Sequence, residues 1–441
     1  MKPSLIVPLI LPLAVAQTQV QSVAQAERID VFPVQTHHRS RVQASIWDSS
    51  SPESPLHPSS SSSNSTHSDG PPVGYTGLKA VRKKILTARK RTDRSTLFDQ
   101  ASIADWEPTD EWRDGYSRKD IEWEEVEVIG PDVSDLDTVV NLARMANDAY
   151  ALPGDARWAE LERFNLTVPF GWEDGGMRGH VFADETNSTV IVSFKGTTID
   201  SGRGKSTARL DRLNDNKLFS CCCGGLSKEQ CGCEKRGVLP GKKRTCLSMC
   251  VRTGLYDSES YYPEAIKLYL SLLSLYPSAQ FWLTGHSLGG SLASLLGLTF
   301  GLPTVTFEAV PDRLSVQRLG LPVPADRRFN PVTHVWHTGD VIATGNCRGP
   351  FSVCGRAGYS IDSVCHQGNL IIYRTVEKWG WPLDRTTRSH TIQYAIDNVY
   401  SKPWNQGETD DRKGRERDWT DVPVAEGEDE SCEDCTGWTY I

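Results

Sequence analysis

The sequence lacks an apolar run long enough to span a bilayer. Its one candidate lies at the start, from Leu5 to Ala16, and prolines at positions 8 and 12 interrupt it. About 12 apolar residues suit the hydrophobic region of a secretory signal peptide and fall short of the ~18–20 that a spanning helix needs. Because the run ends in an A-x-A-like site, we expect residues 1–16 to act as a signal peptide or signal anchor.

Excess positive charge is also absent. The chain has 48 Lys and Arg against 56 Asp and Glu, a net charge of -8, which argues against a nucleic-acid partner. The local exception is KAVRKKILTARKRTDR at residues 79–94. Such a run is typical of a solvated or disordered face, and contact with a membrane surface is the alternative.

The twelve cysteines do not form a pair of C-x-x-C knuckles at a regular interval. That absence disfavours a zinc site, and an even number of cysteines in a secretory protein favours disulfides. Their pairing cannot be read from the sequence. Three N-x-[ST] tripeptides fit the same route as glycosylation sites, at Asn64, Asn165 and Asn187. No metal ion and no other cofactor is expected.

Composition divides the chain into four parts. After residues 1–16, residues 17–115 are rich in Ser and Pro, of low complexity, and predicted to be disordered. Residues 116–404 carry regular hydrophobic periodicity and form the expected folded domain, with a polar, cysteine-rich insertion at 199–257. Residues 405–441 are acidic and irregular, and we expect a mobile tail.

Strand-like and helix-like segments alternate in the folded domain. The patterns predict strands over 178–183, 189–194, 279–283, 304–307, 334–337 and 370–373, and helices over 136–150, 259–275, 287–300 and 391–400. Ser134 with Asp137 resembles a capping box at the start of the first helix. TVIVSF at 189–194 is nearly all apolar and β-branched, as in a strand buried on both faces. The alternation predicts an α/β fold with a mostly parallel sheet flanked by helices.

One strand-to-helix junction carries a candidate nucleophile. FWLTGHSLGG at 281–290 holds Ser287 in a G-x-S-x-G pattern, which by composition alone is also compatible with a simple glycine-rich turn. With a strand before it and a helix directly after it, the pattern is typical of a nucleophile elbow. The elbow exposes the serine at the helix N-terminus, and the backbone N–H of Leu288 is then the natural oxyanion donor.

An activated serine needs a histidine base and an acid that orients it, and in such folds the acid follows the serine and the histidine comes last. Asp340 is the favoured acid because HVWHTGD runs from a strand into a glycine-rich loop. The other aspartates considered lie in polar loops without a preceding strand: Asp312, Asp326 and Asp362.

Two histidines follow Asp340 in the sequence. His390 lies just before the last helix and is the favoured base. His366 is the alternative, although it precedes a strand and should therefore lie at the opposite sheet edge. His286, beside the candidate nucleophile, is expected to be a packing and hydrogen-bonding residue.

The second oxyanion donor should come from a loop after an earlier core strand. TVIVSF runs into Lys195-Gly196-Thr197-Thr198, so Thr197 is the candidate donor, and a simple strand-end turn is the alternative. The stretch between Thr197 and Ser287 contains seven cysteines, and we expect it to form a disulfide-linked lid over the substrate site.

These motifs resemble a known family. SFKGT, TGHSLGG, the GD-V loop and the late SH before a helix are similar to the class 3 (fungal-type) lipases. More closely, GHSLGGSLASLLGLTFGLPTVTFEA, HTGDVIATGNCRGPFSVC and CHQG resemble the autophagy-related lipases of fungi, which break down autophagic bodies in the vacuole. The resemblance covers about residues 110–400. It implies an α/β-hydrolase fold that hydrolyses triacylglycerol and phospholipid esters, with Ser287 as nucleophile, Asp340 as acid and His390 as base.

The resemblance also implies traffic through the secretory pathway to endosome and vacuole. The partners would be lipid substrates and the membranes of autophagic bodies or intralumenal vesicles. That family carries a single N-terminal signal anchor, whereas the apolar run here is short and broken by proline. Two other functions stay open: a soluble carboxylesterase, for example of feruloyl esters, and a catalytically silent binding protein that keeps the hydrolase scaffold.

Overall fold

The computed structural model describes residues 78–92, 121–161, 164, 166–173, 175–198, 206–223, 232–233, 235–236, 244–383, 386–404 and 421–441. Segment 1–16, most of segment 17–115, Asn64 and Asn165 lie outside these residues. Within the described ranges, no helix combines the length and the apolar character needed to cross a bilayer.

The core of the protein is an eight-stranded sheet in the order β12-β11-β10-β9-β8-β5-β4-β3. Its five central strands are parallel, and the strands at both edges pair antiparallel. The strands are β3 (Leu166–Phe170), β4 (Gly179–Ala183), β5 (Thr189–Phe194), β8 (Gln280–His286), β9 (Thr304–Phe307), β10 (Val332–His337), β11 (Asn369–Tyr373) and β12 (Glu426–Gly427). The predicted α/β fold with a mostly parallel sheet is confirmed.

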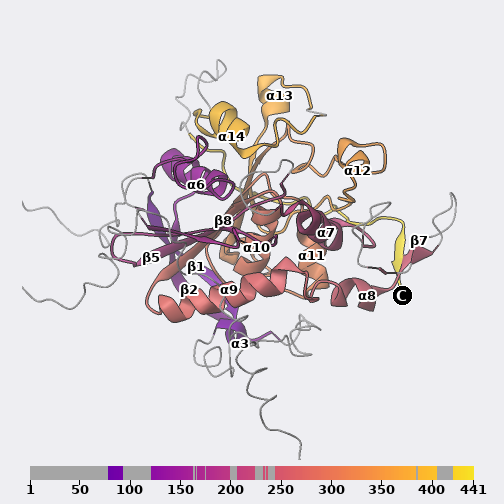
Figure 1. Ribbon diagram of the computed structural model, residues 1–441, viewed down its shortest axis with the longest axis horizontal. Coiled ribbons are helices and arrows are strands. Elements are labelled where there is room, and N and C mark those ends of the chain that lie inside the picture. Colours follow the sequence, from indigo (N-terminus) through magenta and orange to yellow (C-terminus); the bar gives the residue numbers. More distant parts are fainter. Residues whose placement is uncertain are drawn as a thin grey trace, which may run out of the picture.

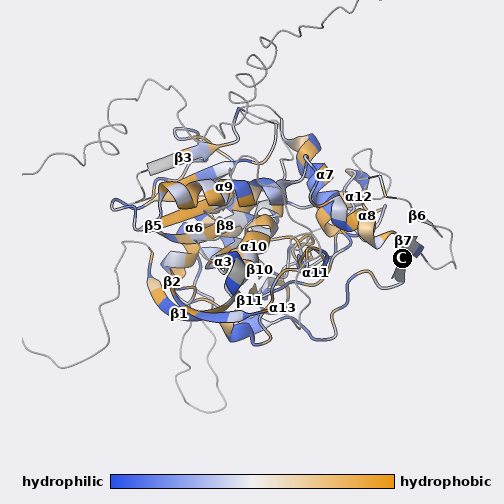
Figure 2. Cartoon of the chain, turned by 90° about the horizontal axis from the view of Figure 1, so that it is seen from below, coloured by the Kyte–Doolittle hydropathy of each residue, from blue (hydrophilic) through white to orange (hydrophobic). Residues whose placement is uncertain are grey.

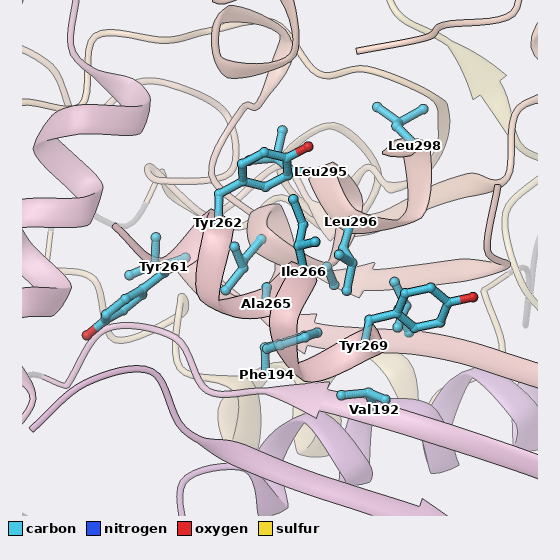
Figure 3. Packing of buried hydrophobic residues seen from close by; sticks show 14 of the residues in the cluster. Val192, Phe194, Tyr261, Tyr262, Ala265, Ile266, Tyr269, Leu295, Leu296 and Leu298 are labelled. Atoms are coloured by element: carbon cyan, nitrogen blue, oxygen red, sulfur yellow. The ribbon is translucent and has the colours of Figure 1, made fainter. Parts of the chain in front are cut away.

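Helices cover both faces of this sheet (Figure 1). One face packs against α6 (Leu136–Asp148), α14 (Ile392–Ala395) and the π-helix Ile396–Tyr400, and the other against α9 (Tyr261–Leu275) and α10 (Leu288–Phe300). The position of strand β5 explains why its sequence is nearly all apolar. Val190, Val192 and Phe194 pack in the α9–α10 layer, whereas Ile191 packs in the α6 layer, because successive strand residues point to opposite faces. Figure 3 shows the first of these layers around Phe194.

The described chain also contains helices that the sequence patterns did not predict. They are α3 (Arg89–Thr92), α7 (Ala208–Phe219), α8 (Ser248–Thr253), α11 (Arg313–Arg318), the 3₁₀ turn Arg327–Phe329, α12 (Val353–Arg356) and α13 (Thr375–Trp379). All of them except α7 have six residues or fewer, too short for a helical period to be recognised, and α7 lies in the stretch 199–257 that we expected to be irregular.

Helix α6 begins one residue later than its capping motif predicted. Asp135 is the N-cap, and its side chain accepts a hydrogen bond from the Thr138 N–H at 2.9 Å. The predicted capping box of Ser134 and Asp137 is therefore wrong. Ser134 instead bonds back to the Asp132 carboxylate at 2.6 Å, which leaves Asp135 to satisfy the free N–H groups of the first turn.

The basic stretch belongs to a strand pair, not to a disordered segment. β1 (Ala80–Ala88) pairs antiparallel with β2 (Trp123–Pro131), which corrects the expectation of disorder for this part of 17–115. The cations face carboxylates across the pair: Arg82 lies 2.8 Å from Glu127, and Lys84 lies 2.6 Å from Glu125. These ion pairs give Arg82 and Lys84 acidic partners on the same face; residues 93–94 of the basic stretch lie outside the described residues.

The segment 421–441 is fastened to the domain, contrary to the expected mobile tail. β12 adds to the edge of the main sheet, and β13 (Trp438–Tyr440) pairs with β7 (Arg244–Cys246) next to β6 (Lys235–Arg236). Two disulfides add covalent links, Cys221–Cys435 and Cys365–Cys432. These bonds outweigh the acidic composition that suggested a tail.

The cysteine-rich insertion is cross-linked as predicted. Its described disulfides are Cys222–Cys246 and Cys233–Cys250, and Cys347–Cys354 closes a separate loop. No described cysteine is free, so the preference for disulfides over zinc is confirmed. Together, α8, β6 and β7 lie at one end of the molecule beside the C-terminus (Figure 2).

Candidate active site

Ser287 stands at a sharp junction between β8 and α10. Its φ of 56° and ψ of -129° are rare for a residue with a side chain, and such local strain is characteristic of functional sites. The flanking glycines make the junction possible. A Cβ at Gly285 would lie 2.5 Å from the Gly289 carbonyl oxygen, and a Cβ at Gly289 would lie 2.2 Å from the Phe194 carbonyl oxygen.

The structure brings three predicted side chains into one chain of hydrogen bonds. His390 Nε2 lies 2.8 Å from Ser287 Oγ, and His390 Nδ1 lies 2.6 Å from Asp340 Oδ2. Asp340 follows β10, and His390 precedes α14. All three residues are buried, although they are 103 and 50 positions apart in the sequence. This is the geometry a nucleophile, a base and an orienting acid require.

Asp340 is held in its charged form. Burial favours the neutral acid, but the charge of His390 and the hydrogen bond to it outweigh burial, and the pKa of Asp340 falls well below its usual range. The second oxygen, Oδ1, accepts the backbone N–H of Ile342 at 2.8 Å. Both carboxylate oxygens therefore have fixed partners, which fixes the orientation of the His390 ring.

His286 supports the site but is not part of the hydrogen-bonded chain Ser287–His390–Asp340, which we call the relay. Its Nε2 lies 2.7 Å from the carbonyl oxygen of His390, and its Nδ1 lies 2.7 Å from the Tyr150 hydroxyl. Burial, reinforced by His390, lowers the pKa of His286 to about 3, so this ring is neutral at physiological pH. It therefore holds the backbone of His390, in line with the packing and hydrogen-bonding role expected for it.

Glu308 is a member of the site that sequence reasoning missed. It directly follows β9, has a φ of 43° and is fully buried. The Tyr400 hydroxyl and the backbone N–H of His337 donate to its carboxyl group, which is also hydrogen-bonded to Asp340. Burial, together with the charge of Asp340, raises the pKa of Glu308 well above its usual range. The raised pKa favours the protonated form of Glu308, which can donate to Asp340.

The loop after β5 lies against the elbow. A Cβ at Gly196 would lie 2.3 Å from the His286 carbonyl oxygen and 2.9 Å from the Ser287 Cβ, so only glycine permits this approach. The contact places the next residue, Thr197, beside the candidate nucleophile. The Thr197 hydroxyl donates to Asp215 Oδ2 at 2.6 Å, which fixes its orientation.

Helix α7 of the insertion anchors this loop through buried carboxylates. Lys195 Nζ lies 3.0 Å from Asp211 Oδ2, and the Thr198 N–H donates to the same oxygen at 2.9 Å. Burial raises the pKa of Asp215, one turn further along α7, to about 8. The first part of the insertion is thus bound into the site by polar contacts, in addition to the disulfides that we predicted for its remainder.

A cavity of about 420 Å³ opens onto Ser287 and His390, within the size range of small-molecule sites. Its apolar walls include Trp172, Val310, Ile342, Val353 and Ile361, and its polar walls include Arg157, Arg178 and Thr197. Apolar walls beside a nucleophile suit a hydrocarbon chain, and the arginines suit an anionic group.

His366, the alternative base, lies in a different cluster. Its Nε2 donates to the Ala343 carbonyl at 2.8 Å, and its ring stacks on Trp336. The ligand atoms of Asp312, His334 and His366 lie within 4.8 Å of one another, a spacing that a metal ion could fit. However, His334 Nε2 faces the Gln367 carbonyl at 2.8 Å, so it carries a proton there.

Asp312 is also already occupied by hydrogen bonds. Its Oδ1 accepts the Gln367 N–H at 2.8 Å and its Oδ2 accepts the Ser294 hydroxyl. Asp312 is fully buried, in contrast to the polar loop that the sequence suggested. We therefore assign a hydrogen-bonded structural network here, and no metal.

Comparison with known proteins gives a consistent assignment. A family model described as "Lipase (class 3)" matches residues 229–344, a range that includes Ser287 and Asp340. A "Putative lipase ATG15" of Cryptococcus neoformans var. neoformans serotype D is 44% identical over 295 residues, which cover 65% of this chain and 55% of that protein. The protein of the same description from Mycosarcoma maydis is 37% identical over 367 residues, which cover 73% of this chain and 69% of that protein.

Among solved structures, the Lip2 lipase of Yarrowia lipolytica is similar over 54% of this chain and 80% of its own, at 18% identity. Its TM-score of 0.30 is too low to support an argument, so the fold is assigned from the strand order and the elbow. The chain spans little more than half the length of the Cryptococcus relative. Because its identity to the Mycosarcoma protein extends over more than two thirds of that relative, the chain belongs to the family described as ATG15 lipases.

Proposed function

We propose that this protein is a serine hydrolase that cleaves the carboxylic esters of membrane phospholipids and triacylglycerol. The observation that carries the proposal is the hydrogen-bonded chain Ser287–His390–Asp340, with links of 2.8 and 2.6 Å, at the wall of a cavity. Membership of the ATG15 family and the match to the class 3 lipase model support the same reaction.

In this mechanism Ser287 Oγ attacks the ester carbonyl carbon while its proton moves to His390 Nε2. Asp340 stabilises the imidazolium that forms and keeps its Nδ1 proton in place. His390 then gives the proton to the leaving alcohol oxygen, and an acyl-enzyme remains on Ser287. Water, deprotonated by the same histidine, hydrolyses this ester and releases the fatty acid.

The oxyanion would be bound by two backbone N–H groups, those of Leu288 and Thr197. Leu288 is the first residue of α10, and first-turn N–H groups have no acceptor within their own helix. Thr197 is held beside Ser287 by the Gly196 approach and by Asp215. One such donor contributes about 3–4 kcal/mol to lowering the barrier.

The cavity supports a lipid substrate. Its apolar side chains can hold an acyl chain. Arg157 and Arg178 line the same cavity, where they can bind a phosphate group. Guanidinium groups bind phosphate oxygens in a fork geometry. A short, uncharged ester would leave most of these groups unused, and this disfavours the soluble esterase function.

The site of action we propose is the lumen of the secretory pathway, with the endosome and vacuole as destinations. The disulfides of the cysteine-rich insertion and of the C-terminal segment favour an oxidising compartment for their formation. Asn187 is exposed in the turn between β4 and β5, where a glycan can be added. The membranes of autophagic bodies and intralumenal vesicles are the proposed partners.

The proposal is tested by lipid-class profiling with the wild type and the Ser287→Ala variant. Long-chain phosphatidylserine, phosphatidylcholine, triacylglycerol and a short soluble ester are supplied separately, and a fluorophosphonate probe reports whether Ser287 is activated. We expect Ser287-dependent labelling and fatty-acid release from the long-chain lipids. Release from the short ester alone would favour the soluble esterase, and absence of labelling would favour a catalytically silent protein.

A further inference from the structure

A small disulfide-closed loop exposes the protein's most accessible large apolar side chain among those described. Cys347 and Cys354 are bonded, with Cα atoms 5.7 Å apart, and Phe351 between them is 87% exposed. An exposed phenylalanine keeps a large apolar surface in water. Transfer of the Phe351 ring into an apolar environment would therefore be favourable.

The loop also forms part of the wall of the Ser287 cavity. Val353, Cys354, Ala357 and Tyr359 line the cavity, so Phe351 is two residues from a lining position. In Figure 1, α12 of this loop lies at the periphery of the molecule, apart from β1 and β2. A surface that accepts Phe351 would thus meet the protein near the route to the nucleophile.

The loop holds Phe351 in a fixed position. The Ser352 hydroxyl accepts the Gly355 N–H at 2.9 Å, and Arg356 Nη1 donates to the Phe351 carbonyl at 2.9 Å. A Cβ at Gly355 would lie 2.1 Å from the Gly349 carbonyl oxygen, so the two ends of the loop are in close contact. Binding through a loop that is already closed loses little conformational entropy.

The charges next to Phe351 along the chain are all positive. Arg348 and Arg356 are exposed on either side of it, and the sequence contains no Asp or Glu between Asp340 and Asp362. Arg348 forms no ion pair with any residue in the described ranges. An apolar aromatic flanked by two exposed cations matches the layered chemistry of an anionic lipid surface, where acyl chains lie beneath negative head groups.

We propose that the loop Cys347–Cys354 is the element by which the protein docks on an anionic membrane. Phe351 enters the interfacial region, and Arg348 and Arg356 contact the head groups. The cavity opening is then held against the lipid layer from which a substrate enters. This inference rests on the proposed function, because it assigns the surface through which the same site meets lipid.

The test measures vesicle binding by the full-length Ser287→Ala variant, which leaves the vesicles intact. Vesicles of phosphatidylcholine alone and of phosphatidylcholine with phosphatidylserine are sedimented, and the partition coefficient is determined. Adding Phe351→Asn should lower the partition about tenfold on both vesicles, and Phe351→Leu should keep it within about twofold. Arg348→Gln should lower it about fivefold on the anionic vesicles only.

Two exposed residues outside the loop serve as matched controls. Val424 is 77% exposed and Arg328 has a side chain 80% exposed, and neither lines the cavity. Val424→Asn and Arg328→Gln should keep the parent partition on both vesicles. Equal partition of Phe351→Asn and Val424→Asn would overturn the docking assignment, as would failure of the parent protein to bind anionic vesicles.

The docking loop and the hydrolase function can each be refuted without refuting the other. Fluorophosphonate labelling of wild-type Ser287 together with unchanged binding of Phe351→Asn would refute the docking loop and retain the hydrolase. Loss of vesicle binding in Phe351→Asn with an unlabelled wild-type Ser287 would support the docking loop and refute the hydrolase.

Discussion

Replacing Asp340 with Asn tests the relay most directly, because the structure fixes how the new amide must lie. Asp340 Oδ1 accepts the Ile342 N–H at 2.8 Å, and Oδ2 faces His390 Nδ1 at 2.6 Å. An amide NH₂ placed toward Ile342 would set two donors against each other. The asparagine oxygen must therefore stay toward Ile342, and its NH₂ group must face His390.

That orientation changes the tautomer of His390. A donor opposite Nδ1 requires Nδ1 to accept, so the single proton of the neutral ring moves to Nε2. Nε2 then cannot accept the Ser287 proton over its 2.8 Å hydrogen bond. An isosteric change of this kind in a serine–histidine–aspartate relay lowers kcat about 10⁴-fold, which corresponds to ~5.4 kcal/mol of barrier.

The assay compares kcat on a long-chain phospholipid and on a short soluble ester for wild type and Asp340→Asn. Asp326→Asn is the matched control, because Asp326 bonds to the neighbouring Arg328 at 2.6 Å and lies outside the cavity lining. Thermal unfolding checks that both variants fold. If Asp340→Asn lost less than about tenfold in kcat while folded, the reasoning about the tautomer would be refuted.

Three further predictions concern side chains around the relay. Glu308→Gln keeps an N–H donor toward Asp340 and should hold kcat within about threefold, whereas Glu308→Leu removes that donor and should lower kcat about tenfold; equal losses would contradict a positioning role. Thr197→Val removes the hydroxyl bonded to Asp215 and should lower kcat about 10–100-fold with little change in KM; a change confined to KM would argue against an oxyanion role. For Asp215, whose burial raises its pKa to about 8, the folded state binds a proton that the unfolded state releases above about pH 4. Stability should therefore decline between about pH 4 and pH 8, by at most ~1.4 kcal/mol per pH unit from this group, and Asp215→Asn should lack that part of the slope in urea unfolding; identical slopes would contradict the raised pKa.

Local patterns predicted the central layers of the fold because each element there is specified by its own residues. β5 is buried along its whole length and is apolar at four of its six positions, and α10 directly follows a serine flanked by glycines two positions away on either side. The α10 junction depends on residues within a few positions, and β5 is buried on both faces of the sheet. The strand and helix positions in the sheet core therefore follow from the sequence.

Segments stabilised by distant partners were not predictable in this way. The lysines and arginines of β1 resemble a solvated run until their partners on β2, about 40 positions later, are known. The segment 421–441 resembles an acidic tail until Cys435 is seen bonded to Cys221, 214 positions away. Neither partner can be identified from local composition.

The candidate site likewise contains residues that local sequence identifies and residues that only distant contacts identify. The sequence by itself determined the candidate nucleophile, because a strained junction at Ser287 requires the glycines that flank it. It also determined the order of the candidate acid Asp340 and the candidate base His390 along the chain. Only the tertiary structure decided that His390, and not His366, reaches Ser287. It also added Glu308, which meets Asp340 because β9 and β10 are neighbours in the parallel sheet. The physical reason is that parallel strands bring their carboxyl ends to one edge, where residues far apart in the sequence come into contact.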